Sequence, residues 1–239
     1  MKRLLFICTV PRTGSSLLVA DMRSTKAMGN PREYFNLAGR YKNNAEKWGL
    51  AFDDLNGNIA QIGKRTSTAN GVVGIKIFER HLSLMVREGL LPDRPGRLRE
   101  LATRFGDPEP VIVTLFRRNK LRQGISFTKA KQTGRWGVLR TAKGEAKYDY
   151  KRLSADIVEL VQREARWHRE LEASGYVPHF ELEYEDLVRE REAVLLRLAQ
   201  LLELPDPASA VAQRDVGEVR LERQADVLTE EWYDRFIKW

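Results

Sequence analysis

Residues 11–16, PRTGSS, include the small and hydroxyl-bearing residue types of loops that bind an anion through backbone N–H groups. They follow an apolar run of strand type, residues 4–8, and precede an apolar run of helical type. The free N–H groups and the dipole at the start of such a helix attract a negative charge. ATP- and GTP-binding loops read GxxxxGK[ST], but here Ser15 follows Gly14, and the nearest cation, Arg12, precedes it. The loop therefore predicts a site for an anion other than a nucleoside triphosphate.

A second group of cations and hydroxyls follows another predicted strand, residues 110–118. This strand ends on Arg117 and Arg118, and Ser126 comes eight residues after Arg118 in a segment of helical type. A guanidinium at a strand end and a hydroxyl one to two turns into the next helix can converge on one anion. Together the two groups predict two anion sites at one sheet edge, which suits a ligand with two separated phosphate groups.

Strand and helix signals alternate along the chain. Residues 71–78 and 110–118 are nearly continuous apolar runs, as in a sheet covered on both faces, and residues 179–187 form a further predicted strand. Helical periodicity covers residues 153–173 and 189–204. This order predicts an α/β fold, a three-layer sandwich with a central, mostly parallel sheet of the P-loop-like nucleotide-binding kind. One domain over residues 1–239 is expected, because no linker or low-complexity stretch divides the chain.

Composition argues against several other classes of function. The single cysteine, Cys8, and three scattered histidines, His81, His168 and His179, show no metal-ligand spacing, so no metal site is expected. No run approaches the roughly eighteen apolar residues of a membrane span. The first apolar run is too short for a signal-peptide core, so a cytoplasmic location is expected.

The net charge of +8 fits a polyanionic ligand. It would also fit nucleic acid or an acidic membrane surface, so the distribution of charge decides. No basic tail is present, and the arginines of residues 93–107 interleave with acids as on a solvated helical face. Nucleic acid is therefore not expected as a partner.

Several motifs resemble those of sulfotransferases that use 3′-phosphoadenosine 5′-phosphosulfate (PAPS). PRTGSS resembles their loop for the 5′-phosphosulfate, RRNKLRQGIS (117–126) their 3′-phosphate motif, and LEYEDL (182–187) a late strand motif. Four further blocks resemble the bacterial trehalose 2-sulfotransferase family: NPREYFN (30–36), RTSTANGVVGIKIFERHL (65–82), QTGRW (132–136) and LERQADVLTEEW (221–232). These blocks run through nearly the whole chain, which makes the resemblance specific.

The resemblance implies roles for residues along the chain. The implied cofactor-binding residues are Pro11, Arg12, Thr13, Gly14, Ser15, Ser16, Arg118, Ser126, Tyr184, Arg223 and Gln224. Backbone N–H groups from Thr13 to Ser16 would cradle the 5′-phosphosulfate, with hydroxyl side chains as added donors. Arg12 stands where many sulfotransferases have lysine, so it would stabilise charge on the departing oxygen without donating a proton.

Glu33 matches the glutamate that the family is proposed to use as its general base. It lies in a loop shortly after the first predicted helix, and that loop can fold over the same sheet edge. From the residues alone, the alternative is a surface glutamate that caps or pairs with Arg32 or a neighbouring helix. Tyr184 would contact adenine, or it would be a core residue of a late strand.

Other residues have less specific interpretations. Lys76, inside an apolar strand, needs either a route to solvent or an anionic partner that the sequence does not identify. Trp167 and His168, on a predicted helix, are expected to pack rather than to transfer protons.

The sequence thus predicts a PAPS-dependent, metal-independent sulfotransferase that acts on a hydroxyl of a carbohydrate or glycolipid, such as a trehalose-like sugar. The resemblance also allows a homodimer. A P-loop kinase is the nearest alternative, although the missing GK[ST] sequence argues against it. A nucleotide- or nucleic-acid-binding module without catalysis is the alternative from another class. Residues 36–65 and 132–151, which would shape the acceptor site, contain no motif that identifies the acceptor.

Overall fold

The protein is built on a parallel β-sheet. A computed structural model describes residues 3–136, 141, 143–215 and 226–238. In these ranges four strands lie in the order β2-β1-β3-β4, and every neighbouring pair is parallel. The strands are β1 (Arg3–Thr9), β2 (Val72–Phe78), β3 (Val111–Phe116) and β4 (Phe180–Glu183). The predicted α/β class with a parallel sheet is confirmed.

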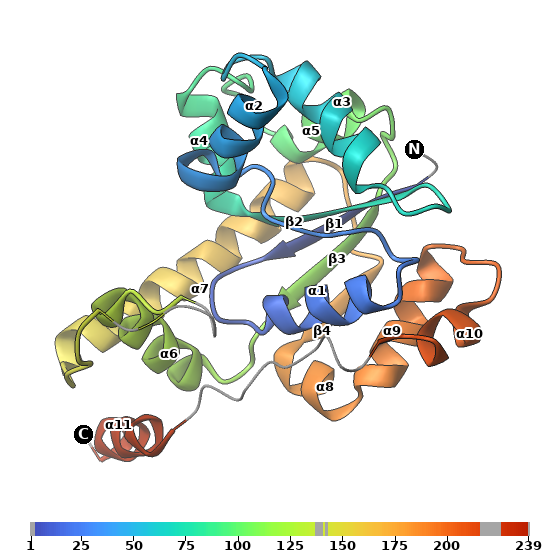
Figure 1. Ribbon diagram of the computed structural model, residues 1–239. Helices are drawn as coiled ribbons and strands as arrows, with labels where there is room; N and C mark the ends of the chain where they lie inside the picture. Colours follow the sequence, from blue (N-terminus) through green and yellow to red (C-terminus); the bar gives the residue numbers. More distant parts are fainter. Residues whose placement is uncertain (1–2, 137–140, 142, 216–225, 239) are drawn as a thin grey trace.

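Helices cover both faces of this sheet (Figure 1). The described helices are α1 (Ser15–Ser24), the π-helix η1 (Leu37–Tyr41), α2 (Lys42–Trp48), α3 (Leu55–Thr66), α4 (Glu79–Arg87), α5 (Arg97–Arg104), α6 (Lys120–Thr133), α7 (Tyr150–Ala173), α8 (Tyr184–Arg189), α9 (Arg191–Leu201), α10 (Pro207–Ala212) and α11 (Val227–Ile237). None of them is both long and apolar enough to cross a membrane.

Alternate residues of the central strand β1 enter two different cores. Leu4 and Phe6 pack with residues of α3, α4, α5 and α7, whereas Leu5 and Ile7 pack with α1 and α9. All four side chains are fully buried, as expected where helices cover both faces of a sheet. The three layers follow directly from this alternation.

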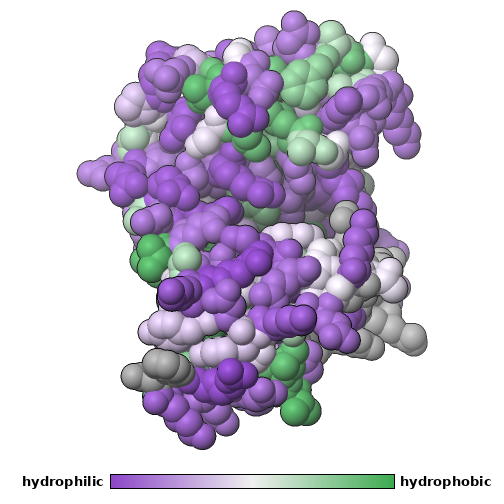
Figure 2. Space-filling view, turned by 90° about the vertical axis from the view of Figure 1, so that its left-hand side faces the viewer, coloured by the Kyte–Doolittle hydropathy of each residue, from purple (hydrophilic) through white to green (hydrophobic). Residues whose placement is uncertain are grey.

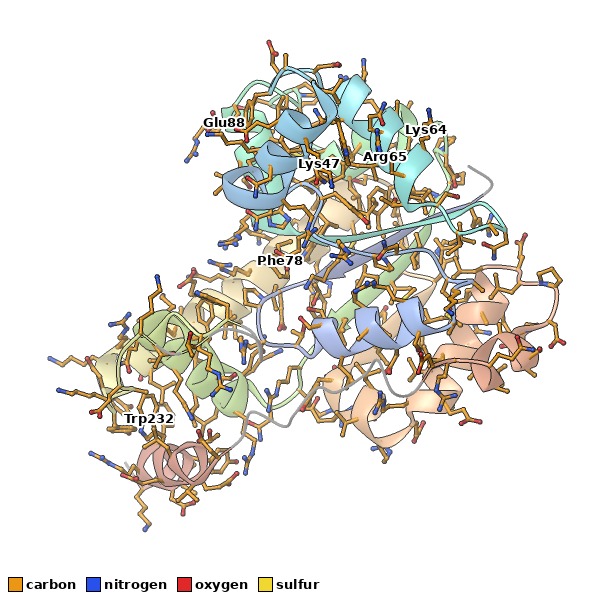
Figure 3. All side chains as sticks on the ribbon, in the orientation of Figure 1. Lys47, Lys64, Arg65, Phe78, Glu88 and Trp232 are labelled. Carbon is orange, nitrogen blue, oxygen red and sulfur yellow. The ribbon has the colours of Figure 1, made fainter. Side chains whose placement is uncertain are left out.

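A third, smaller core lies beside the main sheet. It joins α6, α7 and α11 through Ile125, Leu153 and the buried Trp232, which Figure 3 labels on α11. Glu230 of α11 also accepts two hydrogen bonds from the Arg122 guanidinium of α6, at 2.6 and 2.7 Å. The C-terminal helix therefore holds α6, the helix that carries Ser126.

The fourth strand is shorter than the predicted strand over residues 179–187. Its last residue, Glu183, pairs with Phe116, the last residue of β3. Beyond that pair no neighbouring strand continues, so Tyr184 begins α8 instead. The alternating pattern FELEYEDL could not show where the partner strand stops. Strand β3 also ends at this last pair, so Arg117 and Arg118 lie just after β3 rather than in it.

A short segment runs along the free edge of β2 and continues into Glu33. Arg32 forms an isolated parallel bridge with Ile75, and its carbonyl accepts a hydrogen bond of 3.1 Å from the Lys76 N–H. Gly74 makes this approach possible, because a Cβ there would come within 2.6 Å of Pro31 Cγ. Glu33 therefore lies beside the end of β2.

Gly74→Ala tests this packing. The added methyl group meets Pro31 and the fully buried strand, so we expect the free energy of unfolding to fall by about 1–3 kcal/mol. Urea denaturation followed by circular dichroism measures the change. Gly63→Ala is the matched control, because Gly63 lies in α3 with open space around its Cβ position. That variant should be neutral or about 1 kcal/mol more stable, and equal destabilisation of both variants would contradict the close approach at Gly74.

Candidate active site

Two buried threonines fix the loop that follows β1. The Thr9 hydroxyl donates to the Leu115 carbonyl at 2.6 Å and shares a hydrogen bond of 2.7 Å with the Thr13 hydroxyl. Both threonines are fully buried. The Thr13 hydroxyl therefore faces the interior of the protein, and its contact with a ligand stays a prediction.

Two further side chains hold the same loop from the helices. The Gln123 amide on α6 donates to the Pro11 carbonyl, and the Trp167 indole on α7 donates to the Thr9 carbonyl, both at 2.8 Å. Gln123 and Trp167 are completely buried. Trp167 is a packing residue, as predicted. Its hydrogen bond to the loop could not be predicted from the sequence, because it depends on a tertiary contact. His168 likewise packs, with its ring against that of Phe116.

Arg12 joins the two predicted anion motifs. Its Nε donates to the Ser126 hydroxyl at 2.8 Å, and its Nη1 donates to the Trp136 carbonyl at 2.9 Å. The Arg12 backbone has a φ of 66°, in the left-handed region that non-glycine residues rarely occupy. Burial, and next the charge of Arg117, lower the pKa of Arg12 to about 10. Arg12 therefore remains protonated near neutral pH, in surroundings that favour a negative ligand.

Gly14 lies directly against Tyr184. With a φ of 76°, it occupies the left-handed region, and a Cβ at this position would collide with the Tyr184 ring. The guanidinium carbon of Arg117 lies 4.5 Å from the centre of the same ring. Arg117 Nη1 also donates to the Arg12 carbonyl at 3.5 Å. Tyr184 thus lies beside the loop and Arg117, and it opens α8 rather than ending a strand.

The start of α1 provides N–H groups without intrahelical partners. Gly14 caps this helix without a side-chain hydrogen bond, and its first turn contains no acidic residue. Ser15 is buried and Ser16 is exposed. An anion at this end would meet backbone donors, the helix dipole and the Ser16 hydroxyl.

Arg118 lies at the exposed rim of the site and does not pair with Ser126. Its side chain is 61% exposed, and Nη2 lies 3.2 Å from the Asp186 carboxylate. The Glu185 carboxylate accepts hydrogen bonds from the backbone N–H groups of Arg118 and Asn119, at 3.0 and 3.1 Å. The structure therefore brings Ser126 to Arg12, and Arg118 to Asp186. The arginine beside Tyr184 is Arg117, which was not among the residues selected from the sequence. Its position at the end of the predicted strand could have identified it.

Glu33 and Lys76 form an ion pair at the carboxyl end of β2. Their Oε1 and Nζ atoms lie 2.8 Å apart, and the Lys76 side chain is only 9% exposed. Burial alone would raise the pKa of Glu33, but the charge and hydrogen bond of Lys76 outweigh it, and the pKa lies below its ordinary value. Glu33 is thus ionised at neutral pH, and it is the anionic partner that Lys76 needed. Among the described residues the ion pair of Glu33 is with Lys76 and not with Arg32, whose Nε donates to Asn30 Oδ1 at 3.4 Å.

A small hollow lies beside the loop that follows β1. It is lined by Pro11 of the loop, by Phe78 at the end of β2, by Arg80 of α4 and by Arg163 of α7. Figure 3 labels Phe78 at this end of the sheet. Figure 2 looks onto the side toward which the strand ends point, and hydrophilic residues cover most of it. A larger hollow between α3 and α5 contains none of the predicted site residues.

Two predicted site residues, Arg223 and Gln224, lie outside the described residues. Among the described residues, no group of three or more histidine, cysteine, aspartate or glutamate side chains could hold a metal ion.

Comparisons with known proteins identify the family of this chain. The family model of the Stf0 sulphotransferases matches residues 5–238. A trehalose 2-sulfotransferase from Mycobacterium tuberculosis is 29% identical, with 96% of this chain and 92% of that protein covered. A trehalose 2-sulfotransferase from Mycolicibacterium smegmatis is 27% identical, with 94% and 91% covered. The resemblance seen in the motifs is confirmed, and the chain belongs to the Stf0 sulphotransferase family.

Proposed function

We propose that this protein is a PAPS-dependent sulfotransferase, formed by a single domain, that acts on a hydroxyl of a carbohydrate or glycolipid. The observation that carries the proposal is the Arg12–Ser126 hydrogen bond, which joins the two anion motifs at one sheet edge. Membership of the Stf0 family supports sulfuryl transfer. The comparisons support neither a P-loop kinase nor a non-catalytic binding module.

The described residues fit a nucleotide with two separated anionic groups. The start of α1 and Arg12 suit the 5′-phosphosulfate, and Ser126, Arg117 and Arg118 suit a second phosphate. Tyr184 lies between these groups, against Gly14. When bound, PAPS supplies the sulfuryl group and an anionic leaving group. The contacts of Tyr184, Arg223 and Gln224 with the nucleotide remain predictions.

The loop is proposed to stabilise the negative charge that develops on the departing oxygen. Backbone donors that are already oriented need no rearrangement as this charge appears, so they lower the barrier efficiently. Arg12 adds a fixed positive charge, held in place by Ser126 and the Trp136 carbonyl. Arginine does not release its proton at neutral pH, so its role is charge stabilisation rather than acid catalysis.

Glu33 is proposed as the base that removes the acceptor proton. A loose transition state, as in phosphoryl transfer, makes the proton transfer late, so a carboxylate of low pKa is a sufficient base. The ion pair with Lys76 keeps Glu33 ionised and oriented.

The relatives suggest the class of acceptor. Both are named trehalose 2-sulfotransferases, which supports a trehalose-like sugar here. A cytoplasmic location and a homodimer remain predictions.

Glu33→Gln tests the base. The amide keeps the size of the side chain but cannot take a proton, so we expect kcat to fall roughly 10²- to 10⁴-fold with little change in PAPS affinity. The wild-type rate should fall at acidic pH, below the ordinary glutamate range, because the pKa of Glu33 is lowered. The residual rate of the variant should lack this acidic limb.

Glu88→Gln serves as the matched control for this variant, since Glu88 pairs with Arg87 in an exposed ion pair. It should leave kcat unchanged. The fold of Glu33→Gln is checked by thermal unfolding, because the variant leaves the Lys76 charge without its partner. Near-normal turnover in a folded Glu33→Gln protein would show that another group removes the proton.

Arg118→Ala tests the second anion site. Loss of a charge-assisted pair with a 3′-phosphate should weaken PAPS binding by about 1.5–3 kcal/mol in calorimetric titrations. Adenosine 5′-phosphosulfate, which lacks that phosphate, should bind almost as before.

Arg94→Ala removes another exposed, carboxylate-paired arginine and should affect neither nucleotide. If Arg118→Ala weakens both nucleotides equally, Arg118 does not bind the 3′-phosphate. A selective loss in Arg117→Ala instead would assign that phosphate to the neighbouring arginine.

The dependence on metal ions separates the proposed function from a kinase. Because this mechanism relies on protein donors and cations, sulfuryl transfer from labelled PAPS should be unchanged in excess chelator. A strict requirement for Mg²⁺ would support the kinase instead.

A further inference from the structure

His81 has a buried polar atom without a partner, and this atom is directed at Glu33. The side chain is completely buried near the start of α4. Its Nδ1 accepts a hydrogen bond of 3.3 Å from the Phe78 backbone N–H. Its Nε2 has no hydrogen-bond partner in the described part of the chain and lies 4.0 Å from Glu33 Oε2.

The proton on His81 must be on Nε2. Burial lowers the pKa of His81 to about 3, and the positive charges of Arg80, Lys76 and Arg163 also lower it, although Glu33 opposes them. The ring is therefore neutral at physiological pH. Because Nδ1 accepts from a backbone N–H, the ring hydrogen lies on Nε2, so a hydrogen-bond donor faces a carboxylate oxygen.

The presence of a histidine at position 81 is not explained by packing alone. An unpaired buried N–H destabilises a protein, and the role of Nδ1 as acceptor for the Phe78 N–H does not account for the donor on Nε2. The separation of 4.0 Å is only slightly longer than a hydrogen bond. Glu33 is 26% exposed, so a small rotation of its carboxylate would close this gap.

We propose, on the basis of the proposed function, that His81 is a positioning residue whose Nε2–H donates to Glu33 Oε2 when the acceptor is bound. Lys76 then holds one carboxylate oxygen and His81 holds the other. The plane of the carboxylate is fixed between β2 and α4, and a free lone pair is directed at the acceptor hydroxyl.

The proposed contact also affects the charge of Glu33. A hydrogen bond donated to a carboxylate favours its ionised form. The groups around Glu33 that bear on this are Lys76 and Arg80, whose charges lower its pKa, and His81, which as a neutral ring acts on Glu33 through its Nε2–H. Loss of the His81 donor should therefore raise the pKa of Glu33, while Lys76 and Arg80 remain in place.

Two substitutions separate the donor from the packing. In His81→Asn, the amide oxygen can replace Nδ1 as acceptor for the Phe78 N–H, but no donor reaches Glu33. In His81→Gln, the amide nitrogen can reach the position of Nε2. We expect kcat to fall on the order of tenfold in His81→Asn, with the KM for PAPS unchanged and the acidic limb moved to higher pH. His81→Gln should recover most of both properties.

A purely structural role predicts a different result. The two variants would then lose activity equally, or in proportion to their loss of stability, and the acidic limb would not move. Either result overturns the proposal. Should His81→Asn fail to fold, His81→Phe takes its place, because it keeps the ring and removes the donor.

A second measurement does not depend on turnover. The Glu33 carboxyl carbon is titrated by NMR in protein labelled with ¹³C-glutamate and saturated with adenosine 3′,5′-bisphosphate and trehalose, and the Glu33→Gln spectrum assigns its signal. A raised pKa in His81→Asn, but not in His81→Gln, supports the contact; an unchanged pKa in both overturns it. If the wild type transfers no sulfuryl group from PAPS to any hydroxyl, the proposed function fails, whereas a Glu33 pKa raised in His81→Asn but not in His81→Gln still supports the contact.

Discussion

The parallel alignment of β1 between β2 and β3 is the constraint on which the candidate site depends. In the sheet register Thr9 lies opposite Phe78 on one side and Leu115 on the other. Because parallel strands finish at the same edge, the three segments that follow them emerge together. The anion loop follows Thr9, the helix that carries His81 follows Phe78, and the two arginines follow β3. No single segment contains the site.

Charges at this edge are arranged in two different ways. Lys76 and Glu33 neutralise each other, so both can lie in a largely buried position. By contrast, the charge of Arg117 adds to burial in lowering the pKa of Arg12, and Arg12 donates its described hydrogen bonds to a hydroxyl and a carbonyl. The first arrangement maintains an ionised carboxylate, and the second favours the arrival of an anion. A donor with several negative charges would relieve the repulsion between the arginines as it binds.

The sequence predicted the parts of the site that depend on local pattern. The strand, the loop containing Gly14 and the helix start of residues 4–24 lie within one short stretch, so their interpretation needed no tertiary contact. The partner of Lys76 could not be predicted in this way, because it depends on the bridge between Arg32 and Ile75, 43 residues apart in the chain. Likewise the pairing of Arg12 with Ser126, rather than Arg118 with Ser126, depends on where α6 packs. The alternation around Tyr184 suggested a strand because the end of β3 leaves no trace in that segment.

Because position 12 is an arginine, the leaving group cannot take a proton from this side chain. Its planar guanidinium reaches Ser126 through Nε and the Trp136 carbonyl through Nη1 at the same time, a fork that a lysine ammonium does not reproduce. The gain is a fixed cation between the two anion motifs, but the proton of that cation is not available for transfer. In the proposed reaction the leaving group therefore departs as an anion, stabilised by charge and by backbone donors. The acceptor proton must then leave by a separate route. At this sheet edge Glu33, held by Lys76, can accept it, because its lowered pKa keeps the carboxylate ionised at neutral pH.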